Sequence, residues 1–355
     1  MALPATPSLP AADLAHVLAQ TRGLWAGAGG RRFFITGGTG FFGQWLLESL
    51  VHVNAELDLG LRATVLTRSP TAFAAKAPRL TAAREFEWLE GDIRTFAFPA
   101  GRFDAVIHAA TEATPRLNAQ KPEEVFDAIV GGTKRVLAFA AHSGAEQLLL
   151  TSSGAVYGRQ PSELAQVPED YPGAPDPLLP GSAYGEGKRV AEHLCAVEAA
   201  RHGFAAKIAR CFAFVGPHLP LGGHYAVGNF IRDALAGGPI RVQGDGTPYR
   251  SYLYAADLAV WLWTILFKGA PQRAYNVGSG EALPIAELAR WVAAVAGGNL
   301  SVAVAQIPRP EQPVSRYVPS VDRARNELGL QVWIPLEESL RRTLQFSAQS
   351  HAASR

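Results

Sequence analysis

The 355-residue sequence predicts an α/β protein with a doubly wound parallel sheet of the Rossmann type and a smaller C-terminal lobe. Three observations favour this fold class. Short apolar runs of β-strand character alternate with helical stretches through the first two thirds of the chain. A glycine-rich turn, from Gly37 to Gly43, separates the first of these runs from the first long helical stretch. After residue 210, prolines and glycines divide the chain into loops and short elements.

The predicted elements follow one another in the order of a doubly wound sheet, whose buried strands are apolar runs. Strands are expected at residues 32–36, 63–66, 86–89, 105–108, 147–153 and 206–209. Long helices are expected at residues 41–53, 123–142 and 184–202. The proline-rich stretch 159–180 reads as a loop, and residues 274–277 are expected to cross back to the sheet.

These elements suggest four segments. They are an N-terminal helical extension (1–29), a dinucleotide-binding domain (30–210), a substrate-binding lobe (211–345) and a tail (346–355). In the extension, Leu14, Val17, Leu18 and Trp25 recur at roughly helical spacing, which predicts a short amphipathic helix packed on the domain at 11–25. A partner-binding arm is the alternative.

Composition excludes several classes of protein. With 48% hydrophobic and 18% charged residues, the chain can form a large core, and a net charge of +2 does not favour nucleic acid or an anionic membrane as partner. No apolar run approaches the ~20 residues of a membrane span, and the N-terminus does not resemble a signal peptide. Cys195 and Cys211 have neither metal-ligand spacing nor a disulfide framework. We therefore expect a cytoplasmic protein without a metal site.

The glycine-rich turn has the spacing of a dinucleotide-binding loop. It contains Gly38-x-Gly40-x-x-Gly43 and the three-spaced variant Gly37-x-x-Gly40-x-x-Gly43. Glycines are needed because the backbone adopts positive φ, approaches a pyrophosphate and packs the helix tightly on the strand. The helix N-terminus then faces the phosphates. The cofactor-binding residues expected here are Gly37, Gly40, Phe41, Phe42 and Gly43.

The end of the second strand bears on the choice between NAD and NADP. An acidic residue there binds the ribose hydroxyls of NAD, whereas an arginine receives the 2′-phosphate of NADP. This chain has Arg68 and no acid, so NADP is favoured and NAD stays possible; a solvated surface arginine is the alternative. Further cofactor contacts are expected from Asp92, placed to bond the adenine amino group, and from Ile93, Ala109, Ala110 and Thr111.

Tyr184, Lys188 and Ser153 form a candidate proton-transfer set. A tyrosine must lose its proton to act as a base, and its ordinary pKa is ~10. Lys188 lies one helical turn from Tyr184 and would stabilise the phenolate, and Ser153 at a strand end would bond the substrate oxygen. An isolated Tyr-x-x-x-Lys pair is often a surface helix pair. In combination with the serine and the glycine loop, it indicates hydride chemistry on a hydroxyl or a ketone.

From about residue 32 to 345, the chain resembles the extended short-chain dehydrogenase/reductase family, in its nucleotide-sugar epimerase/dehydratase branch. The motifs are the glycine loop, Ser153 four residues before Tyr157 of Val-Tyr-Gly, the Tyr184/Lys188 pair and the segments 210–217, 228–231 and 244–251. The resemblance implies a nucleotide-diphosphate sugar as substrate. It also implies substrate contacts from Glu112 near the sugar and from Ser153 at the reacting oxygen. Asn229 and Arg250 would meet the diphosphate or nucleotide, with Arg316 as a weaker diphosphate candidate. Val242 and Gln243 would lie near the base.

Two departures from the family pattern rank the possible reactions. The family's 4,6-dehydratases carry an Asp-Glu pair after the catalytic residue, and its decarboxylases a glutamate, where this chain has Gly154 and Ala155. An epimerase therefore comes first. An NADPH-dependent 4-keto-sugar reductase comes second because of Arg68, and a 4,6-dehydratase third. The alternative outside enzymes is an NAD(P)-binding regulatory protein, against which the complete proton-transfer set argues.

A homodimer is also expected. The helices predicted at 123–142 and 184–202 lie on the same side of such a sheet. Their apolar positions could pair across a two-fold axis or could simply pack on the sheet. These positions are Val125, Ile129, Val136, Val190 and Leu194. The family resemblance favours the dimer.

Overall fold

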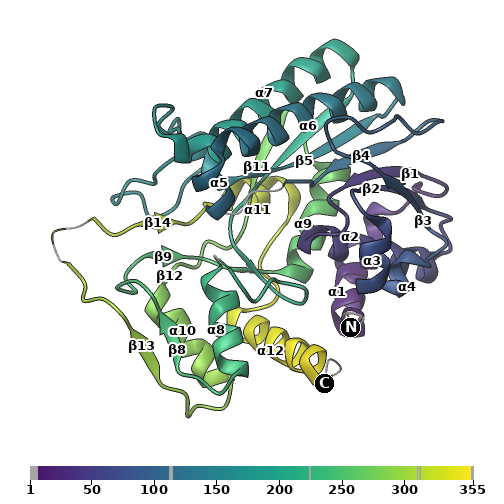
Figure 1. Ribbon diagram of the computed structural model, residues 1–355. Coiled ribbons are helices and arrows are strands. Elements are labelled where there is room, and N and C mark those ends of the chain that lie inside the picture. Colours follow the sequence, from purple (N-terminus) through teal and green to yellow (C-terminus); the bar gives the residue numbers. More distant parts are fainter. Residues whose placement is uncertain (1–6, 112–114, 224, 310, 312, 353–355) are drawn as a thin grey trace.

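The computed structural model describes residues 7–111, 115–223, 225–309, 311 and 313–352. At its centre lies a seven-stranded parallel sheet with helices on both faces, in the order β11-β6-β5-β4-β1-β2-β3 (Figure 1). The strands are β1 (Arg32–Thr36), β2 (Arg62–Thr67), β3 (Phe86–Glu90), β4 (Ala105–His108), β5 (Gln147–Ser153), β6 (Ala205–Cys211) and β11 (Arg273–Val277). The predicted fold class is confirmed, and β11 is the segment expected to return to the sheet.

Alternating side chains of the strands fill two apolar cores, one on each face of the sheet. Phe33 and Ile35 point to the core beneath α1 (Ala11–Thr21), α2 (Phe41–Leu57) and α9 (Ala255–Lys268). Phe34 points to the opposite core, which α6 (Pro122–His142) and α7 (Ala183–His202) cover. Because the residues of α9 are apolar on nearly all sides of the helix, it is buried from Ala255 to Leu266.

The N-terminal segment packs on the sheet domain, as its spacing of apolar residues predicts. Leu14, Val17, Leu18 and Trp25 are buried against the core beside α9 and α2. The helix α1 ends at Thr21 and passes into the short 3₁₀ turn η1 (Arg22–Leu24).

The chain leaves the sheet after β6 and builds a second, smaller part with its own core (Figure 1). This part is interrupted in sequence, because α9 and β11 return to the sheet between its two halves. Its helices are α8 (Ala226–Leu235), α10 (Ile285–Val295) and α12 (Leu336–Ala352). Its strands are β8 (Ile240–Val242) paired with β13 (Val302–Val304), and β9 (Tyr249–Arg250) between β12 (Leu283–Pro284) and β14 (Arg316–Tyr317).

Short elements connect these layers. They are α3 (Pro70–Lys76), α4 (Pro78–Thr81), α5 (Pro115–Gln120), α11 (Asp322–Leu328), the 3₁₀ turns η2 (Gly154–Tyr157) and η3 (Pro180–Ser182), and the pair β7 (Phe214–Val215) with β10 (Leu253–Tyr254). Among the described residues, no helix is long and apolar enough to cross a membrane.

The apolar residues named for dimer contacts on α6 have another role. Val125, Ile129 and Val136 are at most 4% exposed and belong to the core between α6 and the sheet. On α7, Val190 and Leu194 are half-buried. The expectation that Val125, Ile129 and Val136 meet a second subunit is therefore wrong, since the protein's own sheet already covers them.

Candidate functional site

The glycine loop joins β1 to α2 at the carboxyl edge of the sheet. Gly37 has a φ of +74°, and a Cβ atom there would lie 2.5 Å from the carbonyl carbon of Ala109. A Cβ at Gly43 would lie 2.2 Å from the Gly37 carbonyl oxygen. Because both contacts are with backbone, side chains cannot be accommodated at these positions. The loop is thus pressed against the end of β4, and the free N–H groups of the first turn of α2 follow it.

His108 at the end of β4 fixes this edge, a role that the sequence did not reveal. Its Nδ1 lies 2.8 Å from the Thr36 hydroxyl and its Nε2 lies 3.2 Å from the hydroxyl of Thr133. Thr133 donates its proton to a carbonyl of its own helix, so Nε2–H must donate to Thr133 and Nδ1 accepts from Thr36. Burial lowers the pKa of His108 to about 3, and the ring stays neutral. Thr36 in turn accepts the N–H of Ala110, which holds the Ala109–Ala110 backbone beside the glycine loop.

Arg68 and Asp92 lie near each other, where β2 and β3 end. The Arg94 guanidinium donates to both oxygens of Asp92, at 2.8 and 3.0 Å, and the Arg94 N–H donates to one of them. These hydrogen bonds hold the pKa of Asp92 at about 2, and the charge of Arg68 contributes. Ile93 faces α6 at Gly132. The sequence did not reveal Arg94, which adds a second arginine to this end of the sheet.

Ser153, Tyr184 and Lys188 come together at the ends of β5 and α7. The Lys188 Nζ donates to the Thr111 hydroxyl at 2.7 Å and to the Thr151 carbonyl at 2.8 Å. It lies 6.0 Å from the centre of the Tyr184 ring. Burial lowers the pKa of Lys188 to about 8 and raises the pKa of Tyr184 to about 12, the latter opposed by a hydrogen bond with Ser153.

Asn118 on α5 supports the start of the helix that carries Tyr184. Its Oδ1 accepts the N–H of Tyr184 at 3.1 Å, and its Nδ2 donates to the Gly181 carbonyl at 2.6 Å. The Tyr184 N–H belongs to the first turn of α7, where backbone N–H groups lack partners within the helix, and Gly181 belongs to η3 directly before it. No motif marks Asn118 in the sequence.

Tyr317 on β14 also reaches this centre. Its hydroxyl lies 3.4 Å from the Ser153 Oγ and 3.4 Å from the Cys211 carbonyl. Its ring lies against Phe212 with a centroid separation of 4.6 Å. The contact joins residues 164 positions apart, and spacing along the chain therefore gives no sign of it.

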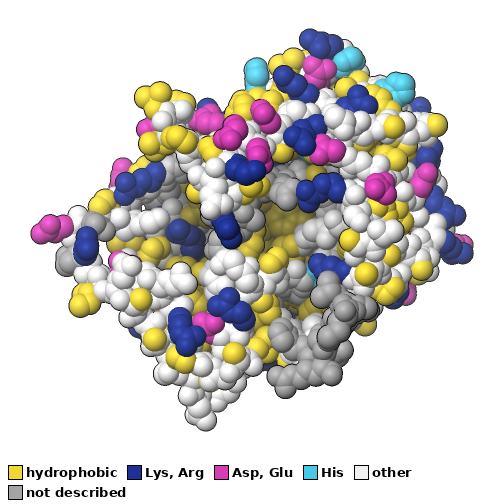
Figure 2. Space-filling view, viewed as in Figure 1, with side chains coloured by type: hydrophobic (Ala, Val, Ile, Leu, Met, Phe, Trp, Pro, Cys, Tyr) yellow, Lys and Arg dark blue, Asp and Glu magenta, His cyan; other side chains and the backbone are white. Residues whose placement is uncertain are grey.

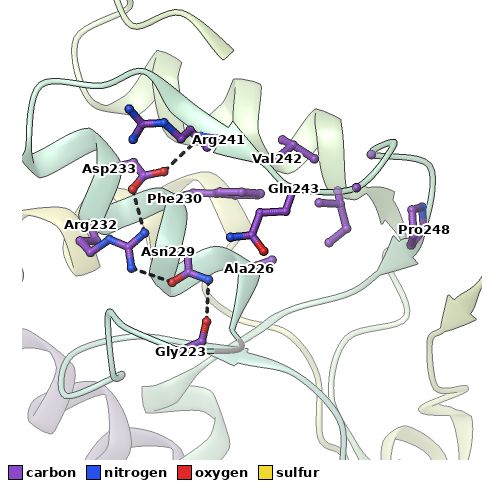
Figure 3. A pocket seen from close by; sticks show the side chains of 13 residues that line it. Gly223, Ala226, Asn229, Phe230, Arg232, Asp233, Arg241, Val242, Gln243 and Pro248 are labelled. Atoms are coloured by element: carbon purple, nitrogen blue, oxygen red, sulfur yellow. Dashed lines mark hydrogen bonds and ion pairs between the residues drawn. The ribbon is translucent and has the colours of Figure 1, made fainter. Parts of the chain in front are cut away.

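A pocket of about 290 Å³ opens beside α8 in the smaller part of the molecule (Figure 3). Asn229 and Val242, two residues expected to contact substrate, line it together with Gln243. The Arg232 guanidinium donates to Asn229 and to Asp233, and the Asn229 amide donates to the Gly223 carbonyl. Figure 2 shows a hollow between the two parts of the molecule, with Lys and Arg side chains around it.

The structure does not bring Arg250 and Arg316 to one face. Parallel pairing of β9 and β14 sets Arg250 opposite Tyr317 and Arg316 opposite Tyr249. Successive side chains of a strand point to opposite faces. The Arg250 guanidinium accordingly lies 5.9 Å from the Tyr317 ring, and that of Arg316 lies 4.2 Å from the Tyr249 ring. Arg250 thus shares the face of Tyr317 and the reaction centre, while Arg316 points away. Glu112, expected near the sugar, is outside the described residues.

Residues 33–278 match the model of the NAD dependent epimerase/dehydratase family. The chain belongs to this family. UDP-glucuronic acid decarboxylase 6 of Arabidopsis thaliana is 30% identical over 309 residues, which are 87% of this chain and 86% of that protein.

Two solved structures share the fold of this family member. The UDP-glucose 4-epimerase of Thermotoga maritima, with UDP-glucose, has a TM-score of 0.74 at 22% identity and covers 90% of this chain and 99% of its own. That of Thermus thermophilus, in complex with NAD, has a TM-score of 0.72 at 26% identity over 89% and 98% of the two chains. The resemblance of the sequence to this family is confirmed, and the protein is an enzyme.

The glycine loop of this epimerase/dehydratase-family enzyme fits a dinucleotide. Gly37 adopts a positive φ, the absence of Cβ atoms at Gly37 and Gly43 lets the loop pack closely between β4 and α2, and a helix N-terminus follows it. Arg68 and Arg94 at the strand ends, and Lys188 and Tyr184 at the reaction centre, are the side chains of this chain that would meet the two ends of the cofactor. Within the described residues, no group of three or more His, Cys, Asp or Glu side chains could hold a metal ion.

Proposed function

We propose that the protein is an NAD(P)-dependent nucleotide-sugar epimerase. The observation that carries the proposal is the composition of the reaction centre. Ser153, Tyr184 and Lys188 provide proton transfer at one oxygen, while Gly154 and Ala155, which follow on η2, offer no acid or base for a second bond-breaking step. A hydride taken from a sugar carbon and returned to its other face needs only this set.

The side chains have separate tasks in this scheme. NAD(P), when bound, supplies the acceptor and donor of hydride. Tyr184 takes the proton of the substrate hydroxyl, and Ser153 holds that oxygen by a hydrogen bond. With a pKa of about 8, Lys188 is largely protonated at pH 7, so its charge favours the phenolate form of Tyr184.

The proposed substrate is a nucleotide-diphosphate sugar. Asn229, Val242 and Gln243 line the pocket beside α8, where a nucleotide would lie. Arg250 lies on the face of β9 that faces Tyr317 and the reaction centre. Its guanidinium could therefore bind a diphosphate that joins the nucleotide to the sugar. A cytoplasmic location is part of the proposal and is supported by the two buried, unpaired thiols of Cys195 and Cys211.

The decarboxylases among the relatives set the main comparison. In that branch, a glutamate follows the catalytic residue, and this chain has Ala155 in its place. Loss of a carboxylate removes a group that can move protons near the sugar. The site therefore favours oxidation and return of hydride over decarboxylation.

A substrate screen tests the proposal. The purified protein is incubated with UDP-, dTDP-, CDP- and GDP-hexoses without added cofactor, and the products are followed by proton NMR. An epimer formed without net change of NAD(P)H supports the proposal, and Tyr184→Phe is the matched inactive control. Parallel incubations contain UDP-glucuronate, or a keto-sugar with added NADPH. Release of CO₂ from UDP-glucuronate, or turnover only of the keto-sugar with consumption of NADPH, would overturn the proposal.

A 4-keto-sugar reductase is the second candidate, and exposed Arg68 at the end of β2 favours it because NADPH suits net reduction. Arg68→Asp should weaken NADPH binding ~10- to 100-fold, the loss expected for one charge-assisted contact, and NADH binding much less. Dissociation constants of both cofactors, measured by fluorescence titration, decide this. Equal losses for the two would remove the reason for NADP preference.

A further inference from the structure

Tyr317 occupies a place in the reaction centre that no motif assigns to it. The pairing of β14 with β9 carries its hydroxyl to within 3.4 Å of the Ser153 Oγ. Its ring is held from one side by Phe212, at 4.6 Å between centroids, and the Arg250 guanidinium lies 5.9 Å from the ring centre. The ring that carries this hydroxyl thus packs against Phe212, which follows β6, and lies near Arg250 on β9.

The space beside Gly154 is filled by the same two rings. A Cβ atom on Gly154 would lie 2.7 Å from two ring atoms of Phe212 and 2.8 Å from the Tyr317 hydroxyl oxygen. Real Cβ contacts are longer than this, so any side chain at position 154 would displace one or both rings. An acidic side chain at position 154 and the observed positions of Phe212 and Tyr317 therefore exclude each other, because they would occupy the same space.

The hydroxyl is a hydrogen-bond partner of Ser153 that keeps its proton. Burial raises the pKa of Tyr317 well above its ordinary value. Ser153 already accepts the N–H of Ala155 at 3.1 Å, and the Tyr317 hydroxyl also lies 3.4 Å from the Cys211 carbonyl. The phenol thus lies between a carbonyl and the serine, where it restricts the rotation of the Ser153 hydroxyl.

We propose that Tyr317 is a positioning residue of the reaction centre. Its hydroxyl orients Ser153, and with Phe212 it fills the space that an acid at position 154 would need. The proposal rests on the role of Ser153 in the proposed function. It adds that this chain is specialised for chemistry at a single oxygen by a side chain from the C-terminal part.

A kinetic double-mutant cycle tests the contact with Ser153, using whichever nucleotide-sugar turnover the substrate screen detects. Tyr317→Phe keeps the ring and should lower kcat about 10-fold with little change in KM, as for one lost hydrogen bond. In a Ser153→Ala background, the same substitution should cost less than about 2-fold. Tyr249→Phe is the matched control, because Tyr249 lies on β9 against Arg316 and faces away from the centre. Equal losses in the presence and absence of Ser153 would overturn the positioning role.

A stability cycle tests the shared space without any substrate. Gly154→Ala should lower the melting temperature by roughly 5 °C, as overpacking does in a domain of this size. The loss should be less than half as large in a Tyr317→Ala background, where Phe212 can turn aside, and intermediate with Tyr317→Phe. Gly23→Ala is the control, since no atom lies within 4 Å of its Cβ position. Equal losses of melting temperature in all three backgrounds would refute the shared packing, even if the enzyme proves to be an epimerase. The expected pattern would support it even if no sugar is epimerised.

Discussion

Burial disfavours the charged forms of both Tyr184 and Lys188. The pKa of Tyr184 is raised to about 12 and that of Lys188 is lowered to about 8. Each shift makes the charged form less favourable in the empty site. In the proposed mechanism, the phenolate of Tyr184 becomes accessible beside the cation of Lys188. Burial of the pair thus costs stability and, in the proposed mechanism, serves reactivity.

Tyr184→Phe is expected to give a folded protein that is nearly inactive. The substitution removes one oxygen and keeps the ring, so packing and cofactor binding should persist. Loss of a general base typically lowers the rate by 10²- to 10⁴-fold. Steady-state kinetics should show a fall in kcat that exceeds any change in KM, and Ser153→Ala should show a smaller fall. Retention of more than about a tenth of the kcat would mean that another group is the base.

Lys188→Met should change how stability depends on pH. Because the pKa of Lys188 is depressed on folding, from 10.5 to about 8, the unfolded chain binds more protons between these values. We compare the free energies of unfolding of the wild type and the variant. The wild-type value minus the variant value should rise by about 2–3 kcal/mol from pH 7 to pH 10. Urea denaturation at both pH values measures the difference, in which the other titrating groups cancel. A difference that falls with pH would show that Lys188 is not buried as a cation.

At the scale of elements, the β1–loop–α2 unit depends on backbone contacts that tolerate no side chain. Gly43 is a residue of α2, yet its Cα lies so near the Gly37 carbonyl that a methyl group would lie 2.2 Å from the oxygen. Helix propensity alone would favour alanine there. Close packing of the helix start on the loop decides against it, as the phosphate-binding role of such a loop requires.

Gly43→Ala should therefore weaken cofactor binding by more than about 100-fold and lower the melting temperature. Gly131→Ala is the matched control, because Gly131 is also helical and a Cβ there meets only the flexible side chain of Arg94, at 3.5 Å. Calorimetric titration with NAD and NADP, and thermal unfolding of each variant, give both readouts. Equal behaviour of the two variants would show that the tight contact at Gly43 can relax.

At the scale of the whole molecule, α1 connects the sheet domain to the C-terminal helix. Asp13 is buried, and its carboxylate accepts from the Tyr254 hydroxyl at 2.6 Å and from the Arg342 guanidinium of α12 at 2.5 Å. His16 bonds to Asp257 on α9 at 2.8 Å. These polar contacts, together with an apolar face, identify α1 as part of the folded body.

We expect a homodimer that forms through the outer faces of α6 and α7, which lie side by side (Figure 1). The inner residues Val125, Ile129 and Val136 are committed to the monomer core, and an exposed apolar side chain, Val197 at 38%, lies on the outer side of α7. Light scattering at micromolar concentration should give twice the chain mass of 37.9 kDa. Val197→Glu should shift the mass toward the monomer. A monomer mass for the wild type would refute the dimer.

The sequence by itself determined the sheet, its cofactor loop and the Tyr184/Lys188 pair. Apolar runs, glycine spacing and helical i,i+4 neighbours are local patterns, and local patterns follow from backbone geometry. Contacts between distant segments were decided only by the tertiary structure. Strand pairing brings Tyr317 to Ser153 and turns Arg316 away from Arg250, and Asn118 reaches Tyr184 across 66 residues. Which residues meet at such a point depends on how strands and helices pack, and no spacing along the chain encodes it.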